Sequence, residues 1–386
     1  MTDVSIVPCP SYAPELCRQA LEAVLAPFGG LDWVRPGMKI AIKANLVSAM
    51  KPEKAATTHP VLLAQLGAML AERGAEVVIG DSPGGLYNAA YVGAVYRAAG
   101  VEAAEQPGVR LNRDFSQAEA RFPEARVAHR FQYTRYLDDA DVILDFCKLK
   151  SHGMMGMSAA AKNLFGVIPG TMKPEYHFKY PDPADFARML VDLNEYFKPR
   201  LAIVDAVVGM EGNGPTAGTP RPIGALLAGP STHRVDLACA ALIGLRREDV
   251  PTLEAACERG LIPASAGELE ISGDLAAFTL RDFRNVEVHN SHLFTGRLPG
   301  PLGKAQSKVL QALLGSRPQV QKKQCVGCGR CGQICPAKAI RMEQKLPVID
   351  RSRCIHCFCC QEFCPRGAMQ VHRTALARLL NRQSKD

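Results

Sequence analysis

The chain has 386 residues, of which 47% are hydrophobic and 22% charged, with a formal net charge of +8. This length and hydrophobic content suffice for one large and one small globular unit, which excludes an intrinsically disordered protein. No uncharged apolar run reaches the roughly eighteen residues that span a bilayer, and no basic segment followed by an apolar one begins the chain. We therefore expect a cytoplasmic protein that does not enter the membrane.

The first 290 residues alternate short β-rich apolar runs with longer amphipathic segments, the pattern typical of a mostly parallel sheet flanked by helices. Strands are predicted at residues 3–7, 38–47, 76–80, 141–148, 200–206 and 223–228. Helices are predicted at residues 13–25, 60–73, 90–99, 184–197 and 232–242. The sequence therefore predicts an α/β domain over residues 1–290.

Polar residues follow two of these strands, and open α/β sheets bind ligands at the carboxyl ends of their strands. The second strand is followed by Lys43 and Asn45, and the third by Asp81 and Ser82 in a glycine-rich turn. We interpret these four residues as candidate cofactor-binding residues. No intact dinucleotide, P-loop or zinc-hydrolase motif is present, so the sequence does not support an NAD, ATP or catalytic zinc site.

Residues 148–170, KLKSHGMMGMSAAAKNLFGVIPG, place several cations around a glycine- and methionine-rich turn. Convergent cations in an apolar stretch favour a small anionic ligand. The catalytic candidates of this segment are Lys148, His152 and Lys162. The binding candidates are Lys150 and Asn163. For any single lysine, an exposed basic loop without a function is the open alternative.

Residues 205–222, DAVVGMEGNGPTAGTPRP, are predicted to form a long loop after a strand, and such loops are usually functional or disordered. Asp205 and Glu211 are catalytic candidates that could donate protons, clamp substrate or bind a metal. Asn213 is a binding candidate. Alternatively, Asp205 caps the next turn and Glu211 is simply solvated.

The C-terminal part changes in composition and charge. Residues 291–318 are predicted to be a linker with a short helix, residues 319–373 a cysteine-rich domain, and residues 374–386 a basic helix or tail. From residue 301 onward there are 16 Lys and Arg against 4 Asp and Glu. This excess favours an acidic redox partner such as a ferredoxin or flavodoxin. No nucleic-acid motif accompanies it, so we expect neither nucleic-acid nor membrane binding.

Nine of the fourteen cysteines fall between residues 325 and 364, and a C-x2-C-x2-C-x3-C-P spacing recurs there after 29 residues. The first set is Cys325, Cys328, Cys331 and Cys335; the second is Cys354, Cys357, Cys360 and Cys364. A tetrahedral zinc site would use four of these thiols and leave four unexplained. The five scattered cysteines are expected to be small buried hydrophobic residues.

This duplicated spacing resembles that of bacterial two-cluster ferredoxins, a resemblance that implies two [4Fe–4S] clusters. In that family the fourth cysteine of each motif ligates the other cluster. The resemblance therefore implies one cluster on Cys325, Cys328, Cys331 and Cys364, and a second on Cys354, Cys357, Cys360 and Cys335. Cys359 departs from the pattern. It stands beside Cys360, where it could compete for a corner of the cluster, or it could lie beside the cluster without ligating it.

Residues 148–170 and 205–222 resemble the two hallmark stretches of the family catalogued as domain of unknown function 362, whose members are often fused to a two-cluster ferredoxin. The resemblance implies a fold and a cofactor but no reaction. Members often carry an acidic residue where the helix after the sixth strand begins, whereas here His233 stands near that point and Asp236 follows. The turn before NLFGVIPG is also loosely similar to the active-site turn of nickel-pincer racemases of the lactate racemase type, without a matching histidine set.

These observations favour a ferredoxin-fused oxidoreductase, in which clusters relay electrons to or from an anionic substrate or organic cofactor held by the α/β domain. Two alternatives remain open. One is a non-catalytic electron carrier or assembly factor that recognises a partner protein. The other is a ligand-binding redox sensor whose affinity depends on the cluster state.

Overall fold

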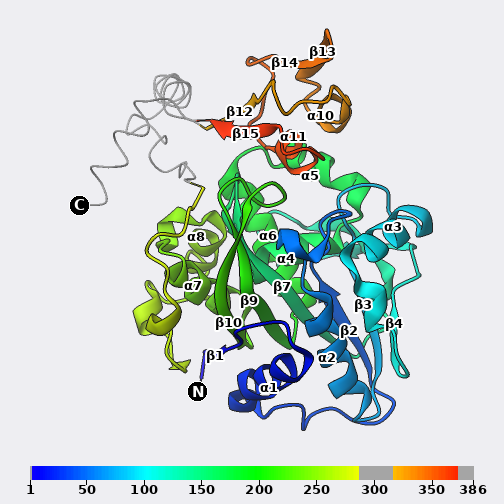
Figure 1. Cartoon of the computed structure of the whole chain (residues 1–386), viewed down its shortest axis with the longest axis vertical. Coiled ribbons are helices and arrows are strands. Elements are labelled where there is room, and N and C mark those ends of the chain that lie inside the picture. The colour runs from blue at the N-terminus through cyan, green and yellow to red at the C-terminus, as the bar shows by residue number, and fades with distance from the viewer. Residues whose placement is uncertain (1, 287–315, 373–386) are drawn as a thin grey trace.

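The computed structural model describes residues 2–286 and 316–372. Figure 1 shows a large domain built on one twisted sheet and a small domain above one edge of that sheet. The predicted linker helix and the predicted C-terminal helix lie outside the described residues. Among the described residues, the helices are all too short or too polar to cross a bilayer.

The large sheet has the spatial order β11-β1-β10-β9-β7-β2-β3-β4, with β8 paired to β7. Its strands are β1 (Val4–Pro8), β2 (Lys39–Ala44), β3 (Glu76–Gly80), β4 (Val109–Leu111), β7 (Val142–His152), β8 (Gly156–Ser158), β9 (Leu201–Glu211), β10 (Thr219–Gly229) and β11 (Ile271–Ser272). Strands β9, β7, β2, β3 and β4 run parallel, while β10 runs antiparallel to both of its neighbours. The predicted mostly parallel α/β sheet is therefore confirmed.

Helices cover both faces of this sheet. They are α1 (Pro14–Leu25), α2 (Pro60–Ala71), α3 (Ala89–Ala99), α4 (Ala160–Asn163), α5 (Lys173–Lys179), α6 (Pro183–Phe197), α7 (Thr232–Leu242) and α8 (Pro251–Cys257). Successive strand residues point to opposite faces, so Ile40 and Ile42 pack with α1 and α2, while Ala41 packs with α6 and α7. This alternation gives the domain two cores, one on each side of the sheet. A separate hairpin, β5 (Gln117–Arg121) and β6 (Arg130–Thr134), extends beyond the sheet.

The six predicted strands and five predicted helices all form, but one segment differs from its prediction. Residues 205–222 are not a long loop, because β9 continues to Glu211 and β10 begins at Thr219, so the turn spans only residues 212–218. The two strands pair antiparallel from Glu211 opposite Thr219. The prolines of β10 gave this segment the composition of a loop. The strand accommodates them beside a bulge between Pro222 and Ala225.

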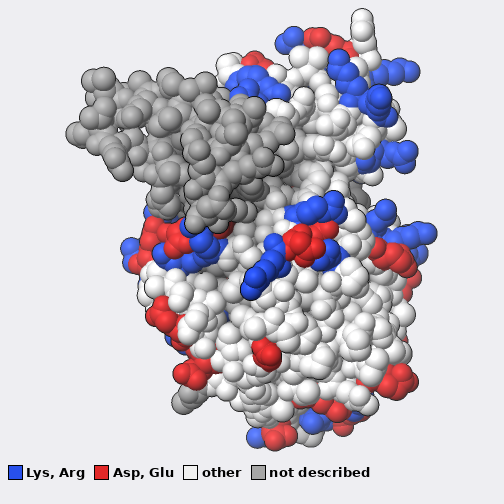
Figure 2. All heavy atoms as spheres, turned by 60° about the vertical axis from the view of Figure 1, so that its left-hand side comes forward, with Lys and Arg blue, Asp and Glu red and all other residues white. Residues whose placement is uncertain are grey.

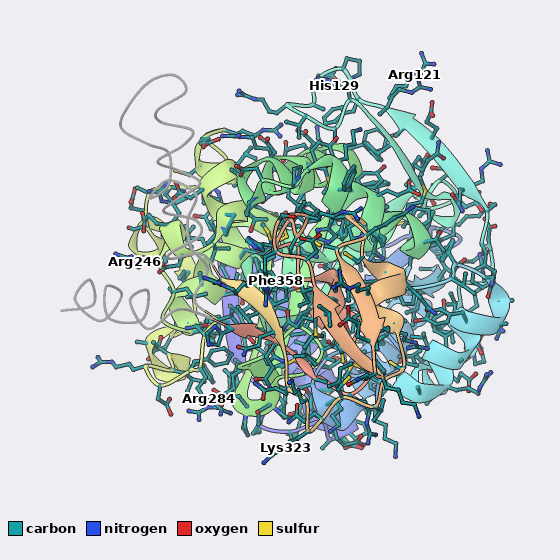
Figure 3. The ribbon with its side chains drawn as sticks, turned by 90° about the horizontal axis from the view of Figure 1, so that it is seen from above. Arg121, His129, Arg246, Arg284, Lys323 and Phe358 are labelled. Atoms are coloured by element: carbon teal, nitrogen blue, oxygen red, sulfur yellow. The ribbon has the colours of Figure 1, made fainter. Side chains whose placement is uncertain are left out.

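The small domain consists of two short antiparallel pairs and two short helices. The elements are β12 (Arg317–Val320) with β15 (Met369–His372), β13 (Ile340–Glu343) with β14 (Leu346–Ile349), α10 (Arg330–Ile334) and α11 (Cys359–Glu362). The two helices begin 29 residues apart, which is the offset of the cysteine repeat. We call this part the ferredoxin domain. Seen from above in Figure 3, Phe358 lies over the middle of the large domain, and its ring joins the core beneath it.

Candidate functional site

Polar side chains gather at the carboxyl edge of the parallel strands, the edge that faces the ferredoxin domain in Figure 1. Strands β2, β3 and β7 are parallel, so the residues that follow them meet at this edge. The sequence candidates from these three strand ends are all buried or nearly so. The open alternative of an exposed basic loop at residues 148–170 is therefore wrong.

A buried ion pair forms the floor of this site. Lys43 Nζ lies 2.8 Å from Asp81 Oδ1, and Asp81 Oδ2 accepts a hydrogen bond of 2.7 Å from the backbone N–H of Leu46. Both side chains are almost fully excluded from solvent. Gly166 packs directly on the pair, since a Cβ at that position would lie 2.2 Å from Asp81 Oδ1 and 2.4 Å from Lys43 Nζ. Glycine is therefore needed at residue 166.

An amide relay joins this pair to a second lysine. Asn163 Oδ1 accepts from Lys43 Nζ at 3.3 Å and from Asn45 Nδ2 at 2.8 Å. Asn45 Oδ1 in turn accepts from Lys150 Nζ at 2.6 Å. The other end of Asn163 donates to Asp145 Oδ1 at 2.6 Å. The structure thus brings together five sequence candidates and adds Asp145, a carboxyl whose pKa burial raises well above its usual range.

Two further lysines and two histidines complete the site. Lys162 Nζ lies 4.7 Å from the centre of the Phe165 ring, and Lys173 Nζ donates to the backbone carbonyl of Ser82. His152 Nδ1 accepts from the N–H groups of two following residues, which leaves Nε2 buried without a partner among the described residues. His177 stacks on Phe186, and its Nδ1 is also unpartnered in the described part of the chain.

We call Lys43, Lys150, Lys162 and Lys173 the lysine cluster. Burial lowers the pKa of three of these lysines. The pKa falls to about 7 for Lys150 and to about 8 for Lys173, and it is also lowered for Lys162. Burial followed by the nearby lysines lowers the pKa of His177 to about 3. Repulsion between like charges adds to this effect, since Lys162 lowers the pKa of Lys150 and Lys173, and Lys43 lowers that of Lys162 and Lys173. The site therefore carries an excess of positive charge that an anion would relieve.

A second buried network lies at the same edge. Lys148 Nζ is 2.7 Å from Asp205 Oδ2, and the hydroxyl of Tyr12 donates to Asp205 Oδ1 at 2.9 Å. The same hydroxyl accepts from Lys148 Nζ at 2.9 Å, and the ring of His59 stacks on Tyr12 with centroids 3.5 Å apart. Lys148, Asp205 and Tyr12 are thus paired with one another, so the network ties the loops after β1 and β2 to β7 and β9.

The remaining candidates of the large domain have other partners. Glu211 accepts hydrogen bonds from the Nε and the backbone N–H of Arg284, at 2.8 and 3.1 Å. Asn213, at the tip of the β9–β10 hairpin, accepts from Gln361 Nε2 at 2.6 Å and donates to the carbonyl of Met369 at 3.3 Å. Both contacts of Asn213 reach the ferredoxin domain. The hairpin therefore serves as a docking arm for that domain.

Asp236 has a structural partner. Its two carboxylate oxygens accept hydrogen bonds of 2.7 and 3.1 Å from the N–H groups of Ala160 and Ala161, at the start of α4. Burial raises the pKa of this carboxyl to about 7. Asp236 therefore holds the start of the helix that carries Lys162.

The eight cysteines of the repeat fall into two spatial groups. One small cavity is lined by Cys325, Cys328, Cys331 and Cys364. Burial raises the pKa of Cys331, and the other three thiols of this cavity raise it further. Cys335 acts in the same way on Cys354 and Cys360. Cys364 therefore lies with the first three thiols of the first motif, and Cys335 lies near Cys354 and Cys360 of the second. Backbone N–H groups of Ala339 and Ala368 donate to Cys335 and Cys364 Sγ at 3.3 and 3.2 Å, the kind of contact that stabilises a metal-bound thiolate.

Helix α11 connects this domain to the lysine cluster. Gln361 Nε2 donates to the backbone carbonyl of Gly214 at 2.9 Å, and Thr216 Oγ1 donates to the carbonyl of Glu362 at 2.9 Å. The charge of Glu362 opposes the lowering of the pKa of Lys150, Lys162 and Lys173. Cys359 is buried beside Cys357 and acts on Lys162 in the same direction. The ferredoxin domain therefore covers the lysine cluster.

Sequence reasoning missed Lys173, His177, Tyr12 and Asp145. Asp145 lies inside a predicted strand, where a polar residue in an apolar run was a usable signal. Tyr12 follows the first predicted strand, whereas Lys173 and His177 lie beyond residues 148–170, and only the tertiary fold brings these three residues to this edge.

Comparison with known protein families shows which families the two domains match. Residues 40–241 match the family described as Domain of unknown function (DUF362). The chain belongs to the DUF362 family. Residues 317–365 of this DUF362 protein match the 4Fe-4S dicluster domain, which supports iron–sulfur binding and electron transfer.

Several proteins are similar to this DUF362 protein. It is 31% identical over 271 residues to the thylakoid-associated protein sll1697 of Synechocystis sp., covering 68% of this chain and 81% of that protein. Among solved structures, the lactate racemase apoprotein from Thermoanaerobacterium thermosaccharolyticum matches with a TM-score of 0.39 and 11% identity over 64% of this chain and 58% of that one. A protein from Thermotoga maritima matches with a TM-score of 0.38 and 14% identity over 60% and 59%. The chain thus spans less than two thirds of either solved protein.

Proposed function

We propose that this protein is an iron–sulfur oxidoreductase that holds an anionic substrate or organic cofactor at its lysine cluster. In this proposal Cys325, Cys328, Cys331 and Cys364 ligate one [4Fe–4S] cluster, and Cys354, Cys357, Cys360 and Cys335 ligate a second. The grouping of the thiols supports this assignment. When bound, such clusters take up and release one electron at a time.

The contact between α11 and the lysine cluster carries the proposal. This helix belongs to the second cysteine motif, yet Cys359 and Glu362 lie close enough to change the pKa of Lys162. A cluster held by this motif would therefore adjoin the bound anion within one molecule, which raises the effective concentration of the electron carrier at the site.

The residues of the site have distinct roles in this proposal. The lysine cluster compensates the charge of the ligand, and the unpartnered Nε2–H of His152 donates a hydrogen bond to it. Lys150, with a pKa of about 7, exchanges a proton as the charge of the site changes. The fully paired Lys148 and Asp205 hold the surrounding loops in place.

Anaerobic purification followed by iron and sulfide analysis tests the cluster assignment, and we expect about eight irons and eight sulfides per chain. Mass spectrometry of small molecules released from the same protein tests the anionic ligand. Adding that ligand to ligand-free protein should then change the visible absorbance of the clusters. If no ligand of the large domain alters the cluster spectrum, the oxidoreductase proposal fails.

A second candidate, an electron carrier for an acidic protein such as a ferredoxin or flavodoxin, is favoured by the surface of the ferredoxin domain. Figure 2 shows Lys and Arg side chains gathered over this domain. The exposed cations are Lys322, Lys323, Arg330, Lys338, Arg341, Lys345, Arg351, Arg353 and Arg366. Such a surface would speed electrostatic association. Reduction by an acidic ferredoxin should slow steeply with salt, and a rate independent of salt would exclude this candidate.

A further inference from the structure

A cleft of about 880 Å³ opens between the two domains. Its large-domain wall comes from the loop after β2, from Tyr91 and from the tip of the β9–β10 hairpin. Its other wall is the ferredoxin domain from residue 323 to 330 and from 362 to 367. This volume is that of a small-molecule or cofactor site. Glu362 lines the cleft, and its charge also raises the pKa of Lys173 in the lysine cluster.

The charge of the cleft is strongly positive. Lys54 from the large domain and Lys323, Arg330 and Arg366 from the ferredoxin domain line it. Within residues 2–286 and 316–372, none of these four cations makes an ion pair. The one carboxylate in the lining is Glu362, whose charge is already opposed by the lysine cluster. The charge of the cleft therefore favours a dianionic ligand, and its two arginines favour phosphate because each can donate two parallel hydrogen bonds to it.

The cleft also adjoins the first group of cysteines. Val326, Cys364 and Pro365 line both the cleft and the small cavity around the four thiols. A molecule in the cleft would therefore be separated from a cluster on those thiols by a single layer of residues. This position suits a ligand that exchanges electrons.

Two aromatic rings, of Tyr91 and Phe363, line the same cleft. The Tyr91 hydroxyl donates to the carbonyl of Gly84 at 2.6 Å, which fixes its ring. Phe363 packs on the same glycine, because a Cβ at Gly84 would lie 2.7 Å from the Phe363 ring. Burial raises the pKa of Tyr91, and the charge of Arg330, which lines the same cleft, opposes that rise. A planar ring and an anionic group would both find partners here.

We propose that the interdomain cleft binds a phosphorylated aromatic redox cofactor of the flavin mononucleotide class, with its phosphate on Arg330 and Arg366 and its ring beside Cys364. This site is distinct from the lysine cluster. Its redox role rests on the proposed clusters, whereas its binding rests on the cleft alone.

Equilibrium dialysis of the full chain, purified anaerobically with its clusters, tests the proposal with flavin mononucleotide, riboflavin and inorganic phosphate as probes. We expect saturable binding of one flavin mononucleotide per chain and at least about ten-fold weaker binding of riboflavin, which lacks the phosphate. The double variant Arg330→Gln, Arg366→Gln should lose about ten-fold or more in affinity. Arg341→Gln is the matched control, because Arg341 pairs with Glu343 on β13 outside the cleft, and it should bind as the wild type does.

Iron and sulfide analysis of each variant separates this inference from the proposed function. Wild-type protein that retains its clusters but binds no flavin mononucleotide would overturn the cleft assignment and leave the proposed function standing. Equal affinity in the double variant would overturn the phosphate position. Binding of inorganic phosphate as tight as that of the nucleotide would show a site for an anion only, and would overturn the aromatic cofactor.

Discussion

Two kinds of buried lysine share the carboxyl edge of the sheet, and their partners distinguish them. Lys148 is held by Asp205 and Tyr12 in a fully paired network. Lys162 rests on the rings of Phe165 and Phe186 and makes no hydrogen bond or ion pair within the described ranges. The first arrangement stabilises the fold, and the second leaves a charge available to a ligand.

Replacing each lysine by methionine should therefore have opposite effects on stability. Lys148→Met leaves Asp205 buried without its counter-charge and should lower the free energy of unfolding by about 3–5 kcal/mol. Lys162→Met removes a desolvated charge and should leave that free energy unchanged or raise it by about 1 kcal/mol. Anaerobic chemical denaturation measures both, with the exposed Lys51→Met as control. Equal destabilisation by the two buried substitutions would contradict the distinction.

Anion binding at the lysine cluster should depend on pH. Because Lys150 and Lys173 have pKa values lowered to about 7 and 8, both are charged below about pH 6.5 and neutral above about pH 8.5. Since an anion binds the charged forms, affinity should fall about ten-fold or more as the pH rises through this range. Sulfate, which does not titrate there, is a suitable probe for calorimetry. Affinity that stays constant across the range would show that these lysines do not bind the anion.

At the residue scale, the sequence predicted the place of a site residue where a polar residue follows a strand. Lys43, Asn45, Asp81 and Lys150 could be placed together because parallel strands end at one edge. The partners could not be predicted, since the hydrogen bond from Asn45 to Asn163 joins residues 118 positions apart. Burial, which lowers the pKa of the lysines, is likewise a property of the packed fold.

At the scale of the element, the short turn after α4 packs directly on the buried ion pair of Lys43 and Asp81. Gly166 lies in this turn and leaves no room for a side chain beside Lys43 and Asp81.

Gly166→Ala should force this ion pair apart and lower the free energy of unfolding by roughly 3 kcal/mol, with loss of sulfate binding. Gly93→Ala is the matched control, because its Cβ in α3 would meet only the flexible end of Arg97 at 3.6 Å. That substitution should stabilise the helix by about 0.5–1 kcal/mol. Thermal denaturation measures the stability of both variants, and calorimetry measures their sulfate affinity. A Gly166→Ala protein with wild-type stability and affinity would refute the requirement for glycine at residue 166.

Strand and helix positions followed from hydrophobic periodicity where one face or both faces of an element are buried. The bounds of β3 and α7 match their predictions. β7 and β9 run further than predicted. β7 continues into polar residues that the edge of the sheet buries, and β9 continues to Glu211 because it pairs with β10 up to that residue. The β5–β6 hairpin was missed although its strands, QAEAR and RFQYT, alternate polar and apolar residues, which was a usable signal.

At the scale of the whole molecule, the fold seats a ferredoxin domain on the ligand edge of an α/β sheet. The β9–β10 hairpin and α11 make the contact through Asn213, Thr216 and Gln361. The cysteine spacing predicted the domain, but its position could not be predicted, since these hydrogen bonds join residues about 150 positions apart in sequence.

Gln361→Ala should weaken this docking, since it leaves the carbonyl of Gly214 and Asn213 Oδ1 without their donor, at a cost of about 1–3 kcal/mol. Hydrogen exchange at the hairpin tip should speed up while the iron content stays unchanged. The exposed Gln333→Ala is the control. Unchanged exchange in the Gln361→Ala protein would argue against the docked arrangement.

The central claim is that the lysine cluster and the iron–sulfur domain act on one another. An EPR-monitored redox titration of Lys162→Met against the wild type tests it most directly. Loss of a cation beside α11 should lower the reduction potential of one of two clusters, by about 60 mV for each 1.4 kcal/mol of lost charge stabilisation, and leave the other unchanged. Two potentials identical to those of the wild type would contradict the claim.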